Sequence, residues 1–329
     1  MKLESYMSLN TVISLADDLL TPCRKITGLS SVLLPFKDNV GTVDWQGFED
    51  QVIRIFESGL FPAVNMETGF VDLISNDLRD EVLQRTHSIA SGRYFVAGAF
   101  VGDQPGANFN LDAYQRAITD IAHFGGVPIL LQSYGLTEQS DDEIIDSYHR
   151  ISWSSDQFIA CEVGSTFAPY GKIYSLDVYR ELVMIDCCTG AQHCSLERYN
   201  EWERLALRNE IRHDFKVYTG NDLTIDMVRY GSDYLLGLST FAPDIFALRD
   251  QFWEQGSDRF YQLNDLLQNL GAFGFRDPTS AYKHTAAMIM KMQGMIQCDA
   301  THPDSPTRPD SDKEVLAGIL ESMNRYRDQ

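Results

Sequence analysis

The chain has 329 residues, which is enough for a large core and within the range of a single α/β barrel. Its 27 basic and 47 acidic residues give a net charge of -20, which disfavours nucleic acid and anionic membrane surfaces as partners. No apolar run approaches the ~20 residues that cross a bilayer, and residues 1–20 carry acidic side chains within their apolar stretch, unlike a secretory signal. We therefore expect a cytoplasmic protein that acts on a small molecule.

The six cysteines show no CxxC spacing, so neither a zinc knuckle nor a disulfide framework is indicated. Cys188, His193 and Cys194 lie close enough in sequence to suggest a metal site. However, neighbouring residues of a strand point to opposite faces, and a metal site needs three or four converging ligands. We predict no metal and no organic cofactor.

A unit of one strand and one helix repeats along the chain from residue 29. Short apolar runs predict the first four strands at 29–34, 61–65, 94–99 and 127–132. Amphipathic patterns predict the helices that follow them at 45–57, 76–90, 111–124 and from 141. Asp44 is placed to cap the first helix, and Ser140 with Glu143 has the spacing of a capping box at the fourth.

Four further units complete the pattern. Their strands are predicted at 158–162, at 187–192, up to Gly220 and at 234–238, with helices at 176–184, after Ser195 and from Pro243. Eight such units, spaced by about 30 residues, favour a TIM (β/α)8 barrel with additional C-terminal helices. An open doubly wound sheet is the alternative, but the chain lacks the glycine-rich phosphate loop of that fold.

The chain is expected to divide into five segments. They are an N-terminal lead-in at 1–25, the barrel at 26–256, C-terminal helices at 257–296, a linker at 297–312 and a terminal helix at 313–329. The linker is rich in proline and aspartate, which makes it too polar and too broken to pack. The terminal helix has apolar residues at helical spacing and must bury them on the barrel or on a neighbouring subunit.

Several short motifs follow the predicted strands in a recognisable order. Residues 33–36 (Leu-Leu-Pro-Phe) follow the first strand, residues 67–69 (Glu-Thr-Gly) the second, and Gly98 lies in the third. Tyr134 follows a strand and a Gln-Ser pair, and residues 219–222 (Thr-Gly-Asn-Asp) end the seventh strand. Across residues 26–295, this order resembles the dihydrodipicolinate synthase and N-acetylneuraminate lyase family, whose members are class I aldolase-type barrels.

The resemblance implies an imine between a strand-six lysine and a 2-oxo acid, a carbon–carbon lyase reaction, and a homotetramer or homodimer. Gln192 occupies the lysine position, and an amide nitrogen cannot form an imine. Glu67 stands in the family's Thr-Thr-Gly site, where its charge would repel a 2-oxo acid by about 1 kcal/mol. Phe109 lies near the position of a relay tyrosine from the adjacent subunit, and the loop 164–171 has no arginine for a distal carboxylate.

The strand ends supply the candidate site. We predict that Tyr134 and Gln192 are catalytic and that the substrate contacts Ser31, Glu67, Thr68, Glu162 and Asn221. Glu67 and Glu162 could instead form a solvated rim, and Tyr134 could be an ordinary partly buried tyrosine. Asp222 is expected to cap the next helix, a role that Asn221 could share, whereas His193 is expected to be structural.

Two functions remain open. The first is a lyase or aldolase acting on a small carbonyl substrate (an oxo acid, aldehyde or sugar acid) without the lysine imine. In this case Gln192 donates a hydrogen bond to the carbonyl and Tyr134 moves a proton. The second is a catalytically silent barrel that serves ligand binding or assembly. Lys172 or Lys283 could also reach the pocket and form the imine instead.

Overall fold

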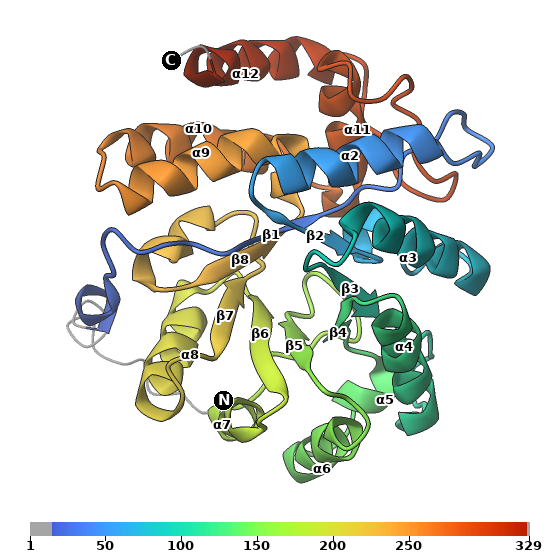
Figure 1. Cartoon of the computed structure of the whole chain (residues 1–329), viewed down its shortest axis with the longest axis vertical. Helices are drawn as coiled ribbons and strands as arrows, with labels where there is room; N and C mark the ends of the chain where they lie inside the picture. Colours follow the sequence, from blue (N-terminus) through green and yellow to red (C-terminus); the bar gives the residue numbers. More distant parts are fainter. Residues whose placement is uncertain (1–14, 328–329) are drawn as a thin grey trace, which may run out of the picture.

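The computed structural model describes residues 15–327, which build a closed barrel of parallel strands surrounded by helices (Figure 1). The strands are β1 (Gly28–Ser31), β2 (Phe61–Val64), β3 (Val96–Ala99), β4 (Val127–Leu130), β5 (Phe158–Val163), β6 (Cys188–Cys194), β7 (Lys216–Thr219) and β8 (Asp233–Leu236). Because β1 pairs with both β2 and β8, the sheet has no free edge. The predicted TIM (β/α)8 barrel is confirmed, and the open sheet is wrong.

Helices follow the strands and cover the outside of the barrel (Figure 1). They are α2 (Trp45–Glu57), α3 (Asn76–Ala90), α4 (Leu111–His123), α6 (Asp141–Ser152), α7 (Leu176–Met184), α8 (Arg198–Ile211) and α9 (Pro243–Glu254). Three short helical turns closely follow strands: η1 (Glu67–Gly69), α5 (Tyr134–Thr137) and η3 (Leu238–Phe241). These three turns lie at the carboxyl ends of the strands, where the candidate site was expected. A fourth turn, η2 (Ile225–Tyr230), leads into the start of β8.

Side-chain caps explain why several helices begin where the sequence predicts. The side chains of Asp44, Ser75 and Ser175 accept hydrogen bonds from the first turns of α2, α3 and α7. Both bonds of the Ser140 and Glu143 capping box are present at α6. Each cap satisfies backbone donors that would otherwise lack a partner at the start of the helix.

Two strands differ from the prediction for a local reason. β1 ends at Ser31 because the Gln51 side chain of α2 takes over the next backbone groups: it accepts from the Leu33 amide (2.8 Å) and donates to the Leu33 carbonyl (2.9 Å). β6 continues to Cys194 because Val163 of β5 remains paired with it. Gln192 therefore lies within β6 rather than at its last position.

The barrel interior is filled by alternate residues of the strands. This inner cluster consists of Leu29, Ala63, Met66, Val96, Val127, Ile129, Ile159, Cys161, Tyr218 and Leu235. Because side chains of a strand alternate between faces, Ser31 shares the inner face with Leu29. The intervening residues join a larger core between the barrel and its helices.

Three further helices follow the barrel: α10 (Arg259–Gly274), α11 (Tyr282–Met292) and α12 (Asp312–Arg327), with the turn η4 (Thr279–Ala281) before α11. In Figure 1, α10 lies beside α9, and α12 lies above both at the top of the view. α12 buries Leu316, Ile319 and Met323 against the chain's own helices. Its apolar stripe therefore packs within the chain and does not need another subunit to cover it.

The segment 297–312 has no helix or strand before α12, as expected of a linker. The expectation that it does not pack is wrong. Arg308 is buried and its guanidinium donates to the carbonyls of residues 274, 276, 277 and 278. The His302 ring lies 5.8 Å from the ring of Phe36 and 6.0 Å from that of Phe70. The proposed segment boundaries stay predictions, and residues 1–14 of the lead-in lie outside the described residues.

Candidate functional site

Gln192 lies inside the barrel with only 7% of its surface exposed. Its amide nitrogen donates to the Leu235 carbonyl of β8 (3.1 Å), and its amide oxygen accepts from the Cys161 thiol of β5 (3.4 Å). Gly220 follows β7 beside it, and a Cβ at Gly220 would lie 2.8 Å from the Gln192 nitrogen. The expected inward position of Gln192 is therefore present, and its amide connects three strands.

A polar network follows β2 at the mouth of the barrel. Glu67 and Thr68 begin η1, and the hydroxyl of Tyr282 from α11 contacts both: it donates to the Glu67 carboxylate and lies 2.7 Å from the Thr68 hydroxyl. Lys283, the next residue of α11, forms an ion pair with the same carboxylate. Phe275 stacks on Tyr282 with ring centroids 4.2 Å apart, which fixes the tyrosine ring over the mouth. We call these four residues, Glu67, Thr68, Tyr282 and Lys283, the mouth network.

Asp222 lies beside the mouth network. Its carboxylate accepts from the Leu238 amide (2.7 Å) at the start of η3, after β8. The expectation that Asp222 caps the next helix is wrong, because η2 begins at Ile225 without a side-chain cap. Burial and the nearby Glu67 charge raise the pKa of Asp222 to about 8, although the hydrogen bond from Leu238 opposes the rise. Asp222 therefore holds a proton at neutral pH and can act as a hydrogen-bond donor.

Tyr134 is the first residue of α5, after β4. Both oxygens of the Asp103 carboxylate accept backbone amides there, from Tyr134 (2.9 Å) and from Gly135 (2.8 Å). The Tyr134 ring leans edge-on against Tyr170, with centroids 5.6 Å apart. The side chain is partly exposed at the carboxyl end of the barrel, which fits the predicted position.

Two of the predicted substrate contacts occupy different environments. Ser31 is buried at the end of β1, on the inner face of the barrel. Asn221 is also buried, but both ends of its amide bind backbone: it donates to the Ser195 carbonyl (2.7 Å) and accepts from the Leu223 amide (2.9 Å). Asn221 joins the loops after β6 and β7, and these contacts fit a structural role better than a pocket role.

Glu162 does not face the mouth, contrary to the prediction. It shares the outer face of β5 with Phe158 and Ala160, beneath α8. Its carboxylate accepts from Arg204 of α8 (2.8 Å) and lies 2.6 Å from Nδ1 of His193, which is also outward-facing. These two partners outweigh burial and lower the pKa of Glu162 to about 2. Glu162 and His193 are therefore structural.

The two lysines considered as alternative imine formers are both paired. Lys172 donates to the Gln139 carbonyl (3.2 Å) and lies 3.4 Å from the Asp141 carboxylate, on the outside at the start of α6. Lys283 does reach the mouth, but it binds Glu67 there. Each lysine is thus engaged by a carboxylate of the protein.

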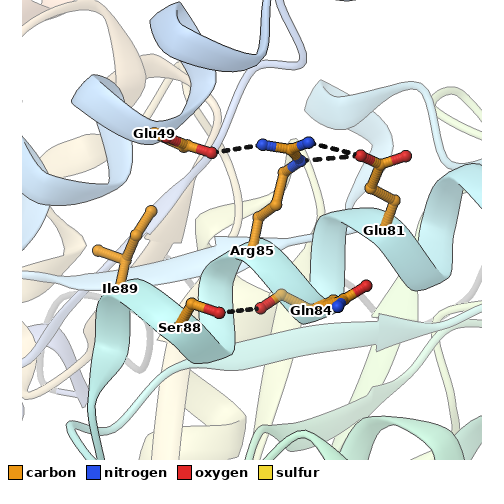
Figure 2. Close-up of a pocket in the computed structure, with 6 residues that line it drawn as sticks. All are labelled: Glu49, Glu81, Gln84, Arg85, Ser88 and Ile89. Atoms are coloured by element: carbon orange, nitrogen blue, oxygen red, sulfur yellow. Dashed lines mark hydrogen bonds and ion pairs between the residues drawn. The ribbon is translucent and has the colours of Figure 1, made fainter.

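A surface hollow between two helices lies away from this chemistry. It is lined by Glu49, Glu81, Gln84, Arg85, Ser88 and Ile89 of α2 and α3. Figure 2 shows that Arg85 forms ion pairs with both Glu49 and Glu81, so the charged groups of the hollow bind one another. A second hollow lies near Phe109, which stacks on Tyr114. Neither contains a strand end, so the candidate site stays at the barrel mouth.

Among residues 15–327, no three His, Cys, Asp or Glu side chains converge as a metal would require. Burial raises the pKa of the Cys161 thiol to about 12, and that of Cys194 is raised by the same cause. These thiols stay protonated, and that of Cys161 donates to Gln192. No helix in the described part of the chain is long and apolar enough to cross a membrane.

With the geometry in place, comparison with known proteins gives a consistent fold. No family model and no curated protein matches the chain. The structure is similar to dihydrodipicolinate synthase from Thermotoga maritima, with a TM-score of 0.77, 17% identity, and coverage of 92% of this chain and 99% of that one. It is also similar to the enzyme from Bacteroides thetaiotaomicron (0.77, 13%, 90% and 98%) and to a monomeric dihydrodipicolinate synthase variant (0.76, 18%, 91% and 97%).

Structural neighbours of this chain are thus barrels of the dihydrodipicolinate synthase type, as the motif order suggested. At these identities the likeness concerns the fold alone. The substrate, and the effect of having Gln192 at the predicted lysine position, must be argued from the residues of the site.

Sequence reasoning missed part of the mouth network. Tyr282 received no role, because it belongs to a helix beyond the barrel and no strand pattern marks it. Lys283 was considered only as a distant alternative. An adjacent tyrosine and lysine at the start of a helix that is mostly apolar from Ala286 to Met290 is the signal that could have drawn attention to them. Asp222 was expected only to cap a helix. Its raised pKa depends on burial and on the charge of Glu67, which another loop brings close to it.

Proposed function

We propose that this chain is an enzyme of the dihydrodipicolinate synthase-like lyase or aldolase type that acts on a small carbonyl substrate without a lysine imine. The observation that supports it best is the mouth network with Asp222, which keeps donors and acceptors at the carboxyl ends of the strands. A TIM barrel places its chemistry at this end. Because all six cysteines are unpaired, a reducing compartment such as the cytoplasm fits the proposal.

In this proposal Gln192 and Tyr134 act on the substrate carbonyl. One hydrogen of the Gln192 amide nitrogen binds Leu235, and the other polarises the carbonyl oxygen of the substrate. A donor of this kind stabilises a developing oxyanion by roughly 3 to 4 kcal/mol. Tyr134 supplies or removes the proton. These contributions support enolisation, hydration or a retro-aldol step on an activated substrate, but they do not replace an iminium for unactivated pyruvate.

A catalytically silent barrel is the second candidate, and a specific observation favours it. The Gln192 amide binds Leu235 and Cys161, and the Asn221 amide joins two loops through Ser195 and Leu223, so these amides can be explained by stability alone. Against it, polar groups of Glu67, Thr68, Tyr282 and Asp222 still gather at the mouth, and the Glu67 carboxylate there is half-exposed.

Borohydride trapping with pyruvate tests the absence of an imine. We expect no covalent adduct on the native protein, because Gln192 cannot form one and both candidate lysines are paired. We expect Gln192→Lys to form an adduct only when Glu67→Gln is also present, since the Glu67 charge repels the 2-oxo acid. Mass spectrometry of peptides after reduction identifies the modified residue.

A panel of aldehydes, sugar acids and 2-oxo acids then separates the two candidates. Turnover of a non-pyruvate carbonyl compound without any adduct supports the proposed enzyme. An adduct on Lys172 or Lys283 of the native protein contradicts it. Binding without turnover for every compound favours the silent barrel.

A further inference from the structure

We propose that Lys283 is a buried anion-binding group and that the Glu67 carboxylate fills the position of the anion, so that the mouth selects neutral hydroxylated aldehydes and ketones over 2-oxo acids. This inference rests on the proposed function, because it assigns a substrate class to the same site. Lys283 and Glu67 lie more than 200 residues apart in the chain and come together at the barrel mouth.

The first step of the argument is the burial of Lys283. Only 4% of its side chain is exposed, and its ammonium lies 5.1 Å from the centre of the Phe70 ring. Removing an ammonium from water is costly unless an anion accompanies it. Glu67 is the anion that contacts it in the described structure. Lys283 therefore needs a carboxylate at this place, whether that carboxylate belongs to the protein or to a ligand.

The second step is the exposure of Glu67. Its side chain is 57% exposed, so the carboxylate lies between the buried ammonium and the solvent at the mouth. A ligand approaching Lys283 meets the Glu67 charge first. A 2-oxo acid is repelled there, whereas a hydroxyl group can donate a hydrogen bond to the same oxygens.

The third step is the local charge. Lys283 and Glu67 cancel, and the neighbouring Asp222 holds its proton at neutral pH because its pKa is raised to about 8. The mouth network is thus close to neutral although the whole chain carries a charge of -20. Removing the Glu67 charge alone turns the mouth into a positive site with a ready ammonium donor.

Calorimetry with a pair of small ketones tests the inference. Pyruvate and hydroxyacetone share a methyl ketone, but the first carries a carboxylate and the second a hydroxyl group. We expect native protein to bind hydroxyacetone more tightly than pyruvate. In Glu67→Gln, we expect pyruvate binding to tighten by about 10- to 100-fold, the range given by a charge-assisted hydrogen bond, with a much smaller change for hydroxyacetone.

Two variants serve as controls. In Glu67→Gln combined with Lys283→Met, the gain in pyruvate binding should disappear, because the freed ammonium is absent. In Asp141→Asn, which releases the solvent-accessible Lys172 from its own ion pair, pyruvate binding should stay at the native level. Thermal unfolding verifies that each variant is folded, and Glu67→Ser replaces Glu67→Gln if the amide disturbs Tyr282.

Each outcome decides a separate part of the inference. Three results overturn the buried anion site. They are no gain in pyruvate binding in either Glu67 variant, a gain that persists when Lys283 is also replaced, and a gain of the same kind in Asp141→Asn. The substrate class is overturned if native protein binds pyruvate as tightly as hydroxyacetone or more tightly. It is also overturned if native protein binds neither compound. Because calorimetry requires no turnover, a lack of activity on every substrate contradicts the proposed function and leaves these binding results standing.

Discussion

Glu162 and Gln192 occupy neighbouring strands and face opposite ways. Cys161 pairs with Gln192 in the β5–β6 register, and both point into the barrel, whereas Glu162 and His193 form the next pair and point outward. Strands of a parallel barrel are buried on both faces, so their sequence lacks the alternation that would reveal which side is inner. The motif order could place Gln192, but nothing in residues 158–162 alone could show that Glu162 belongs to the other side.

The outward position of Glu162 predicts an effect on acid stability. Its pKa falls from 4.5 in the unfolded chain to about 2 in the fold, so its contribution is complete above pH 4.5 and is lost as the pH falls toward 2. We expect Glu162→Gln to lower the free energy of unfolding at pH 7 by about 3 to 5 kcal/mol, because Arg204 is left buried without its anion. Urea denaturation at pH 7 and at pH 3 measures both effects.

A matched control is available on the helix that carries Arg204. Glu210 of α8 pairs with Arg180 at the surface (3.5 Å), so Glu210→Gln should change stability by less than about 1 kcal/mol. The difference between native protein and Glu162→Gln should shrink at pH 3, since native Glu162 is losing its advantage there. A Glu162→Gln protein as stable as Glu210→Gln at pH 7 would contradict the structural role.

At the scale of elements, local signals determined helices better than strands. α2, α3 and α7 have the predicted bounds because Asp44, Ser75 and Ser175 lie beside them in sequence and cap them. The early end of β1 depends on Gln51, which lies on another element, so no local pattern could predict it. The mouth network shows the same limit, since α11 brings Tyr282 and Lys283 to Glu67 across more than 200 residues of chain.

Arg308 makes several of the hydrogen bonds that hold segment 297–312 against the C-terminal helices. The Arg308 guanidinium donates to four carbonyls that end α10 and lead into α11, and its backbone amide donates to His284 Nδ1 (2.6 Å). We expect Arg308→Ala to lower the free energy of unfolding by about 3 kcal/mol, since four backbone carbonyls lose a charged donor. Limited proteolysis should then cut this segment first, and chemical denaturation measures the loss.

Arg325 provides the comparison for Arg308. It lies on the exposed side of α12 and pairs with Glu321 within one helix turn. Arg325→Ala should therefore change the free energy of unfolding by less than about 0.5 kcal/mol. Equal stability of the two alanine variants, with unchanged cleavage, would show that segment 297–312 does not depend on Arg308.

For the whole molecule, the C-terminal helices change the argument about assembly. The apolar stripe of α12 was expected to need either the barrel or another subunit, and Leu316, Ile319 and Met323 are buried within one chain. Oligomerisation therefore depends on surfaces other than the buried face of α12.

We nevertheless predict a homo-oligomer, a tetramer or a dimer, from the resemblance in motif order, and its mass tests the prediction. Light scattering at micromolar concentration should give a multiple of the 37.2 kDa chain mass. Val315→Glu, on the exposed side of α12, should leave that mass unchanged, because the apolar stripe of this helix already packs on its own chain. A native mass near 37.2 kDa would contradict the prediction, whereas dissociation by Val315→Glu alone would place the interface on α12 after all.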